Sequence, residues 1–545
     1  MRRLFGPILS LLSVAALGQE PAPPPSAALP GFRESVEVRV MDLDVAVTDS
    51  KGKPITDLTK EDFNVKVANQ AVPIDYFTRI EAGTIHAPDL GTASPDRVLA
   101  EYRKGPDAYV PRHFLIYFDI GSLSQQSRKR GLEAMRDLVT KFGPSDSARV
   151  VLFDRQPTTL CEWTESKETI FAALDKIENA GVGMSRLITE QQTLSEIDST
   201  PRRGGRGSGR QFLAHSYAEQ QHAALDILLK DMWAELSTLT PMPGKKAFIY
   251  VSGGFEMQPG YAMSAYAVGA FSLAQFDVPN MSQHVDALVQ RANSSDVTFY
   301  SLDARGLTAP GGTAGGDDPL LARPGVAFIA RQDSQAGLID LARQTGGLSF
   351  TDTNSLKPGI AQIYDDTSSY YSIGVNLSKV PGKGYQAVSV TVNRPGATVR
   401  SRRGFASRTP KDRGRDLTQA TLRSNAEFRA FPVELRIAPA KKVKKYYELP
   451  ILLSVPASAL TFIQDEKGSR AVADIYVGAI DSRGFTSEVG YDQAVFALPP
   501  GAKPDTELKY QTKLEIRKGN MRIAVNVQDR ETGKIGTAKA DVKVE

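Results

Sequence analysis

Continuous apolar runs that alternate with amphipathic helical stripes dominate the middle of this chain. The runs are Phe114–Phe118, Val150–Phe153, Ala247–Val251 and Val297–Leu302. Between them, apolar residues recur at helical spacing, most clearly over a long helix expected at about 218–240. A strand buried on both faces and followed by a helix is typical of a parallel sheet covered by helices. Residues 111–377 therefore predict a doubly wound α/β domain, with a last helix at 356–368 and a last strand at Tyr371–Leu377.

Regions with strand patterns flank this domain. Residues 36–79 alternate apolar and polar side chains and predict a small β module, and residues 386–405 predict a β hairpin that turns at Pro395-Gly396. Residues 406–424 are basic and polar, which favours a linker. Residues 425–545 predict an all-β sandwich of immunoglobulin or fibronectin type. Its expected strands are 447–456, 470–481, 489–499, 507–518, 521–529 and 536–544.

The first residues have the pattern of an export signal. Met1-Arg2-Arg3 precedes the short apolar run Leu4–Leu17, and small residues stand before Gln19. We expect a signal peptide over 1–18 that is cleaved near Gly18, followed by a Pro/Ala-rich tether over 19–35. No cysteine stands at the cleavage site, and no later run reaches the roughly 20 apolar residues of a membrane span. The mature protein is therefore expected to be secreted or periplasmic, without a transmembrane span.

Composition limits the chemistry that the chain can perform. Its 66 Lys+Arg and 62 Asp+Glu leave a net charge of +4, which is too small for a general nucleic-acid binder. The single cysteine, Cys161, excludes an intramolecular disulfide framework and is expected to be an inert core thiol. Common hydrolase and nucleotide-binding motifs are missing. The segment Gly205–Gly209 predicts a flexible basic loop, and Asp365-Asp366 are expected on an exposed helix face.

Long segments follow the carboxyl ends of the predicted parallel strands. They are residues 119–126, 181–216, 255–282 and 306–333. Ligands of open α/β sheets bind at this edge, and loop length gathered at one edge is typical of a recognition surface. Dispensable insertions are the alternative. We expect a protein or a cell-envelope polymer to bind here, with these contact residues: Asp119, Ser122, Ser124 and Ser252.

Several motifs, in consistent order, resemble a known family. They are Val45–Asp49, Gly52–Pro54, Asp57–Phe63, Lys245–Gly254, Tyr300–Gly306, Thr345–Gly347, Ser369–Gly374 and Val399–Gly404. Over residues 36–405 the chain resembles the secreted VWFA-related proteins common in Acidobacteria. Its α/β region resembles a von Willebrand factor type A domain. This resemblance implies a Rossmann-like fold that binds partners, often through a metal-ion-dependent adhesion site.

The family's metal site takes Asp-x-Ser-x-Ser after the first strand, a threonine from a second loop and an aspartate from a third. Such hard oxygen ligands suit Mg²⁺. Here the segment Asp119–Ser124 shifts both serines by one position, and no Gly-Thr pair stands near Ser185 and Thr189. The third loop, Ser252–Gly254, has no carboxylate. We therefore expect a degenerate site without a resident cofactor, although Mg²⁺ is possible, and the metal candidates are Asp119, Ser122 and Ser124.

The expected function is that of an exported, non-enzymatic protein-binding or scaffolding protein. One alternative is a metal-dependent adhesin that uses Asp119, Ser122 and Ser124. Another is a non-catalytic subunit of a cell-envelope enzyme or secretion assembly. A hydrolase with an unrecognised site is disfavoured, because no nucleophile–base pair is visible in the sequence.

Overall fold

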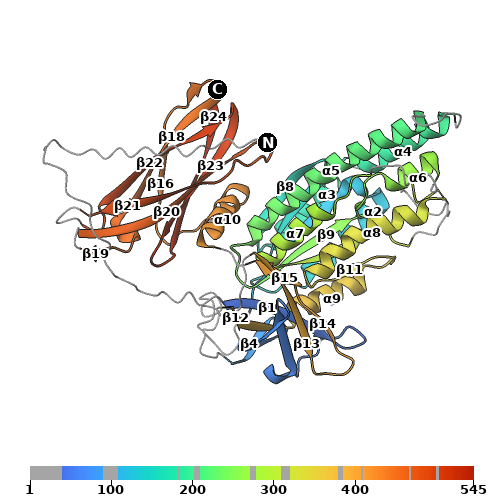
Figure 1. Cartoon of the computed structure of the whole chain (residues 1–545), viewed down its shortest axis with the longest axis horizontal. Helices are drawn as coiled ribbons and strands as arrows, with labels where there is room; N and C mark the ends of the chain where they lie inside the picture. Colours follow the sequence, from blue (N-terminus) through green and yellow to red (C-terminus); the bar gives the residue numbers. More distant parts are fainter. Residues whose placement is uncertain are drawn as a thin grey trace. The chain divides into compact units, whose positions relative to one another are not determined.

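The chain has a mixed α/β fold with several sheets (Figure 1). The computed structural model describes residues 40–89, 109–181, 184–201, 209–269, 278–307, 319–323, 325–377, 384–406, 409–465, 468–498 and 503–545. The expected signal peptide and tether lie outside these residues. In the part of the chain that is described, no helix is long and apolar enough to cross a membrane.

A six-stranded sheet with the order β11-β10-β9-β6-β7-β8 organises the middle of the chain. Its strands are β6 (Arg112–Asp119), β7 (Ser147–Asp154), β8 (Gln156–Thr164), β9 (Lys245–Ser252), β10 (Val297–Asp303) and β11 (Ser349–Phe350). Neighbouring strands are parallel, except that β8 runs antiparallel to β7. The apolar runs identified in the sequence are therefore neighbouring parallel strands, and their carboxyl ends lie at one edge.

Helices cover both faces of this sheet. One face carries α2 (Gln125–Thr140), α3 (Lys167–Glu178) and α9 (Lys357–Ser368), and the other carries α5 (Gly209–Leu239), α7 (Ser282–Ser294) and α8 (Ala327–Gln344). Alternate residues of β6 belong to different cores, because successive strand side chains point to opposite faces. Phe114, Ile116 and Phe118 join the first core, whereas Leu115 and Tyr117 join the second.

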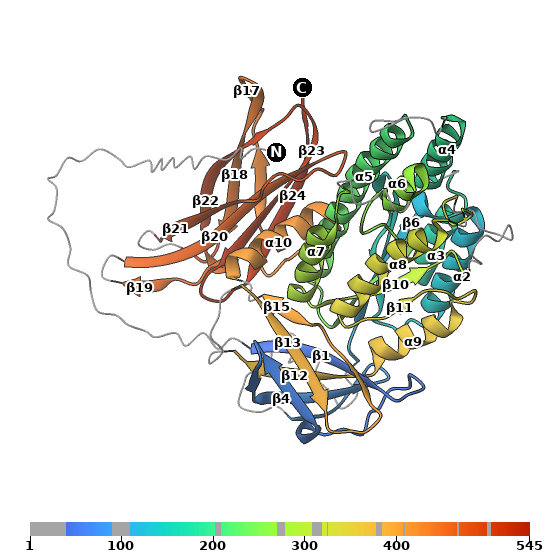
Figure 2. The same ribbon diagram turned by 45° about the vertical axis from the view of Figure 1, so that its right-hand side comes forward.

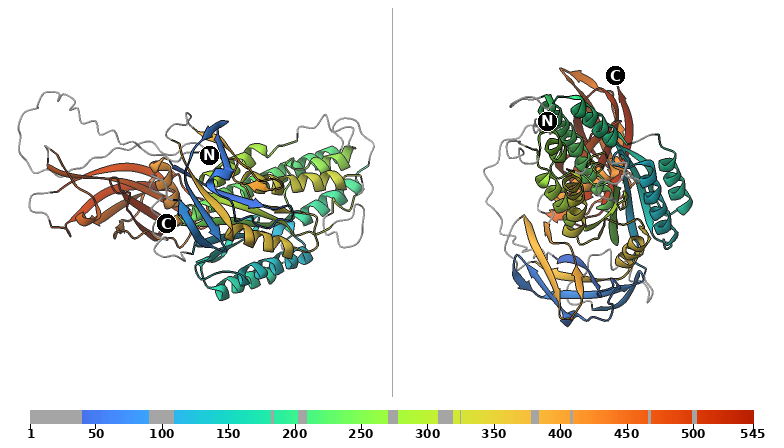
Figure 3. Two further views of the ribbon diagram at one scale, coloured as in Figure 1. Left: turned by 90° about the horizontal axis from the view of Figure 1, so that it is seen from below. Right: turned by 90° about the vertical axis from the view of Figure 1, so that its right-hand side faces the viewer.

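Two further sheets combine strands from the start of the chain with strands that follow α9. One has the order β14-β1-β12-β4-β5 and the other β15-β13-β2-β3. The strands are β1 (Val40–Thr48), β2 (Phe63–Val67), β3 (Gln70–Val72), β4 (Ile74–Glu81), β5 (Thr84–Asp89), β12 (Tyr370–Asn376), β13 (Tyr385–Val392), β14 (Thr398–Arg400) and β15 (Gly404–Ala406). The sheets share one hydrophobic core. Both views of Figure 3 show the blue N-terminal strands beside the yellow strands that follow α9.

The pairing partners of β12 and β13 differ from those predicted from the sequence. The sequence predicted Tyr371–Leu377 as the last strand of the parallel sheet, but β12 runs antiparallel between β1 and β4. Its near-continuous burial explains the error, because burial alone does not identify the sheet to which a strand belongs. The hairpin predicted over 386–405 forms only in part: β13 pairs antiparallel with β15 and also with β2, whereas β14, which was expected to return against β13, pairs with β1. Gly374 is required in β12, because a Cβ there would lie 1.8 Å from the ring of Tyr76.

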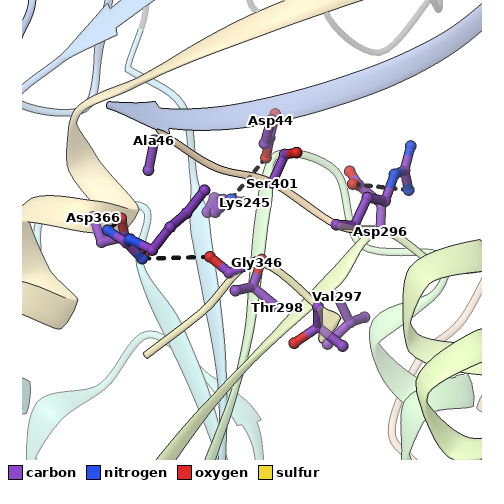
Figure 4. A pocket seen from close by; sticks show the side chains of 12 residues that line it. Asp44, Ala46, Lys245, Asp296, Val297, Thr298, Gly346, Asp366 and Ser401 are labelled. Carbon is purple, nitrogen blue, oxygen red and sulfur yellow. Dashed lines mark hydrogen bonds and ion pairs between the residues drawn. The ribbon is translucent and has the colours of Figure 1, made fainter. Parts of the chain in front are cut away.

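Charged pairs join these N-terminal sheets to the amino ends of β9 and β10 and to helix α9 (Figure 4). The pairs are Lys245–Asp44 (2.9 Å), Arg400–Asp366 (2.5 Å) and Arg402–Asp296 (3.2 Å). They line a cavity of about 20 Å³, which is room for one water molecule. This junction lies at the sheet edge opposite to the one where partners were expected.

The C-terminal region consists of two sheets that share one core. The first contains β16 (Glu434–Ile437), β17 (Lys441–Val443), β18 (Tyr446–Pro456) and β22 (Glu507–Ile516). The second contains β19 (Ile463–Asp465), β20 (Gly468–Asp481), β21 (Gly490–Ala497), β23 (Gly519–Asp529) and β24 (Ile535–Val544). Each strand predicted from the sequence in this region is present.

Residues 410–423 form helix α10, not the linker expected over 406–424. Thr409 and Asp412 make a capping box, and Pro410 stands in the first turn, where proline is tolerated. Buried Asp416 of α10 forms an ion pair of 2.7 Å with buried Arg291 of α7. The polar residues that suggested a linker therefore belong to a helix that packs against α5 as well as against β20 and β23.

Candidate functional site

Asp119 lies at the carboxyl end of β6, in the middle of the six-stranded sheet. The residue is only 5% exposed. Its carboxylate Oδ2 accepts hydrogen bonds from the Ser252 hydroxyl (2.9 Å) and the Tyr250 hydroxyl (3.2 Å). Burial raises the pKa of Asp119, and the positive charge of Arg186 together with the hydroxyl donors opposes that rise. The protein's own groups thus satisfy much of this carboxylate.

Ser122 and Ser252 complete the network around Asp119. Strands β6 and β9 are parallel neighbours, so residues 119 and 252 meet at the same edge. The Ser122 hydroxyl donates to the Asp119 carbonyl oxygen (2.9 Å) and lies 2.9 Å from the Ser252 hydroxyl. The backbone N–H of Gly253 donates to Ser122 Oγ (2.9 Å), and that of Gly254 donates to Ser252 Oγ (3.0 Å). Both hydroxyls are therefore engaged within the protein.

Ser124 is separate from this network. It is the N-cap residue of α2, and its Oγ accepts the backbone N–H of Ser127 at 3.1 Å. N-capping is a common structural role for serine. Of the predicted contact residues, the structure brings together Asp119, Ser122 and Ser252, whereas Ser124 serves the helix that follows.

Helix α4 (Ser185–Ser199) brings residues that the sequence reasoning had not assigned to the site. A Cβ built on Gly121 would lie 3.1 Å from Ser185 Oγ, 3.2 Å from Asp154 Oδ1 and 3.5 Å from Asp119 Oδ1. These three side chains therefore meet around one glycine. Arg186 Nη1 donates to the Gly254 carbonyl oxygen at 2.6 Å, which ties the start of α4 to the end of β9.

Tyr250 could have been found from the sequence, but Arg186 could not. Tyr250 stands two residues before Ser252 in a strand, so the two side chains share a face. The sequence before Arg186 shows no strand or helix periodicity from which its contact with the sheet could have been predicted. Thr189, noted in the sequence as a nearby hydroxyl, donates to the Ser185 carbonyl within α4 (2.9 Å).

Ser122, Ser124 and the third loop do not supply the divalent-ion ligands that the family resemblance implies. Mg²⁺ requires several hard oxygen ligands. Ser122 is bonded to the Asp119 carbonyl and to Gly253, Ser124 caps α2, and the third loop carries no carboxylate. Among the described residues, no group of three or more His, Cys, Asp or Glu side chains could hold a metal ion. The guanidinium of Arg186 supplies positive charge beside Asp119 instead.

Helices packed on one another occupy much of the carboxyl edge. We call this set the helical cap: α4, the first part of α5, α6 (Tyr261–Val268), residues 319–323 and the first part of α8. Its shared core includes Leu194, Tyr217, Met263, Leu320 and Val326. Buried Glu190 accepts the backbone N–H of Leu320 (2.7 Å), and Arg210 donates to the Ala267 carbonyl (3.0 Å).

The helical cap corrects the expectation of long loops over 181–216, 255–282 and 306–333. The described parts of these segments contain helices and buried side chains, so they are not freely dispensable. Small apolar and alanine-rich sequences hid α6 from the periodicity analysis, because they lack a clear polar face. Residues 182–183, 202–208, 270–277, 308–318 and 324 of these segments lie outside the described residues.

Large apolar side chains of the helical cap face solvent. Phe212 of α5 is 71% exposed and Phe328 of α8 is 73% exposed. Ile188 of α4 is also exposed. Each aromatic residue is followed in sequence by a partly buried residue that packs against the cap core, Leu213 and Ile329 respectively. A rigid, packed support therefore presents both rings to solvent.

Three other candidates from the sequence can now be placed. Cys161 is buried in a hydrophobic core, and burial raises the pKa of its thiol, which agrees with an inert residue. The expectation that Asp365 and Asp366 are both exposed is wrong, because Asp366 is buried and accepts the Tyr300 hydroxyl at 2.5 Å. Gly209 begins α5, so the glycine-rich segment does precede a helix; its other residues, 205–208, lie outside the described part.

No family model and no curated protein matches the chain. An aerotolerance-related membrane protein of Bacteroides fragilis is 13% identical over 47% of this chain and 98% of that chain, with a TM-score of 0.24. The conserved hypothetical protein BatB of Bacteroides thetaiotaomicron is 12% identical over 47% of this chain and 96% of that chain, with a TM-score of 0.21. Proximal thread matrix protein 1 of the mussel byssus is 12% identical over 48% of this chain and 47% of that chain, with a TM-score of 0.23. Likeness at this level assigns the chain to no family.

Proposed function

We propose that this is an exported, non-enzymatic binding or scaffolding protein whose helical cap docks a protein partner without a divalent ion. Residues 112–368 act as a type A-like domain, and the C-terminal sheets act as an immunoglobulin- or fibronectin-like sandwich. The motif order in the sequence and the mostly parallel sheet with helices on both faces support this assignment. This proposal assigns no catalytic residues.

The exposure of Phe212 and Phe328 carries the proposal. Aromatic residues are enriched among the side chains that contribute most to protein–protein binding. Both rings stand on helices that pack into the core of the helical cap, so little conformational entropy is lost when a partner covers them. The hydrogen bonds around Asp119 support docking without a metal, since Oδ2 of its carboxylate and the hydroxyls of Ser122 and Ser252 already have partners.

Capture of partners from a cell-envelope extract tests the proposal. The bait is the full mature chain, crosslinked in the presence of chelator or of Mg²⁺. The variant Phe212→Ala/Phe328→Ala should lose the captured partner, while Phe485→Ala/Val495→Ala should retain it. The control residues are equally suited to truncation, because both are 61% exposed but lie in the C-terminal region, Val495 in β21 and Phe485 in the connection between β20 and β21. Equal capture by both variants would remove the helical cap as the docking surface.

The chelator arm separates the alternatives. Capture that requires Mg²⁺ and disappears in Asp119→Ala would favour a metal-dependent adhesin. A stoichiometric complex with an envelope enzyme, insensitive to chelator, would favour the non-catalytic subunit. An activity panel on the purified protein tests the hydrolase reading.

A further inference from the structure

One end of the C-terminal sheets carries a concentrated positive surface. Strand β17 and the start of β18 form a hairpin with the sequence Lys441-Lys442-Val443-Lys444-Lys445-Tyr446-Tyr447, which we call the lysine hairpin. Residues 441–445 are all exposed. Figure 2 shows β17 at the same end of these sheets as the carboxyl terminus. The small net charge of the whole chain conceals this local excess.

Strand register adds further basic residues to the same end. Tyr447 pairs with Lys442 on one side and with Ile516 of β22 on the other. Arg517 and Lys518 follow Ile516 directly and are exposed. In the described part of the chain, neither the four lysines of the hairpin nor these two residues take part in an ion pair. The nearest carboxylate in the hairpin register, Glu448, pairs with Lys513 at 2.7 Å.

The turn of the lysine hairpin places a charged residue, Lys444, in an unfavourable backbone conformation. Val443 pairs with Tyr446, which leaves Lys444 and Lys445 as a two-residue turn. Lys444 has φ +57°, in the left-handed region that favours glycine or asparagine. A lysine at this position retains charge where another residue type would suit the backbone better. Residues in unfavourable backbone conformations cluster at functional sites.

The chemistry of the surface favours anionic lipid headgroups over nucleic acid. Lysine ammonium groups act as mobile point charges, which suit a diffuse layer of headgroup phosphates, and they do not form the planar bidentate contacts by which arginine reads base edges. Val443, at the end of the hairpin, is 48% exposed between lysines, and two half-buried tyrosines follow. An apolar apex surrounded by lysines and tyrosines matches the boundary between headgroups and acyl chains. Single-stranded nucleic acid is instead bound in grooves with stacking platforms.

We propose that the lysine hairpin, together with Arg517 and Lys518, docks the protein on the anionic surface of a lipid membrane. The ammonium groups contact headgroup phosphates, and Val443 enters the interface. This surface shares no residue with the helical cap, so binding to a membrane and binding to a protein partner use different residues. Failure of either proposal leaves the other intact.

Co-sedimentation of the full mature chain with lipid vesicles tests the proposal. The vesicles contain either phosphatidylcholine alone or equal parts of phosphatidylcholine and phosphatidylglycerol. We expect binding only to the anionic vesicles, and weaker binding at higher salt. Each lysine near such a surface contributes about fivefold in affinity. The variant with Lys441, Lys442, Lys444 and Lys445 all changed to Gln should therefore lose at least about 100-fold.

A charge-matched control is available at the other end of the C-terminal sheets. Lys503, Lys509, Arg530 and Lys534 are exposed, and they lie near the start of β22 or just after the end of β23. Changing these four to Gln alters the net charge equally and should leave vesicle binding nearly unchanged. Equal losses in both variants would mean that net charge, not the lysine hairpin, drives binding, and would overturn the proposal. Equal binding by the wild type and the hairpin variant would overturn it as well.

Measuring how deeply the tip of the lysine hairpin enters the bilayer distinguishes a membrane ligand from a soluble polyanion. In Val443→Trp, brominated lipids should quench fluorescence beyond the level seen in the wild type, which contains Trp163 and Trp233. Absence of added quenching, combined with displacement from the vesicles by soluble polyphosphate or duplex DNA, would show a polyanion site and contradict membrane docking.

Discussion

The hydroxyl of Ser252 donates a 2.9 Å hydrogen bond to the carboxylate of Asp119, across the ends of two neighbouring parallel strands. In the resembled family this aspartate position helps to hold a divalent ion. Here the carboxylate also accepts the Tyr250 hydroxyl and lies beside the charge of Arg186. Hydroxyl donors to Oδ2 and the charge of Arg186 thus offset part of the cost of burying this carboxylate.

Stability should therefore not depend on divalent ions. A specific site would raise the free energy of unfolding by about 2.7 kcal/mol at a hundredfold excess over Kd. Thermal unfolding curves in chelator, Mg²⁺, Mn²⁺ and Ca²⁺ should superimpose at constant ionic strength. A metal-specific rise in Tm that vanishes in Asp119→Ala would contradict this.

Asp119→Ala itself should destabilise the protein by about 1–3 kcal/mol, because it strands two buried hydroxyl donors. That loss should be the same with and without metal. Chemical unfolding of the variant in chelator and in Mg²⁺ provides the comparison.

Patterns within single elements could be predicted, whereas pairing between distant elements could not. The runs at Phe114–Phe118 and Ala247–Val251 gave the buried strands, because burial on both faces leaves a continuous apolar sequence. The same rule misplaced β12, whose partners β1 and β4 lie near the start of the chain. Helix α10 was missed because its contacts are polar, as the Asp416–Arg291 pair illustrates.

The residues of the candidate site likewise include some that could be predicted from the sequence and one that could not. Asp119, Ser122 and Ser252 follow from one rule, that parallel strands end at one edge. Arg186 reaches the site through helix α4, and its role depends on tertiary packing that no local spacing records.

The core of the helical cap should be required for stability. Met263→Ala, at a side chain with 0% exposure, should cost about 2–5 kcal/mol through lost burial and a cavity. Phe212→Ala should cost less than about 0.5 kcal/mol, because the ring faces solvent. Thermal unfolding with limited proteolysis of the cap measures both. Equal stability of the two variants would mean that the cap is dispensable, which is the alternative of dispensable insertions that the sequence left open.

Helix α10 should be held by its buried charge pair. Asp416→Ala leaves Arg291 buried without its carboxylate partner and should cost about 3–5 kcal/mol. Asp541→Ala removes a carboxylate from a surface pair with Arg522 and should cost less than about 1 kcal/mol. Proteolysis near residues 406–424 should accelerate only in Asp416→Ala. Rapid cleavage of the wild type there would support a linker instead.

Export is testable directly. The apolar run Leu4–Leu17 and the small residues before Gln19 predict that N-terminal sequencing of the exported protein begins at or near Gln19. Recovery of the intact N-terminus from cytoplasmic material would contradict the prediction.

A buried carboxylate on α5 should make stability depend on pH near neutrality. Burial, followed by the negative charge of Glu235, raises the pKa of Asp231 from 3.8 to about 7, against the opposing charges of Arg423 and Arg149. The Tyr117 hydroxyl donates to Asp231 at 2.8 Å, and Arg423 of α10 lies 3.5 Å away. The folded state therefore binds a proton more tightly than the unfolded state does at this residue.

The sign of the effect follows from linkage. A raised pKa contributes stability that is fully present below the unfolded value of 3.8 and is lost as the pH rises through about 7. Asp231→Asn keeps an acceptor for Tyr117 but removes the titration. Relative to this variant, the wild type should lose on the order of a few kcal/mol of unfolding free energy across that range. Urea unfolding at a series of pH values measures the difference, with Asp226→Asn, a partly exposed position on the same helix, as the control. Parallel curves for the wild type and Asp231→Asn would mean that Arg423 and Arg149 keep Asp231 ionised throughout.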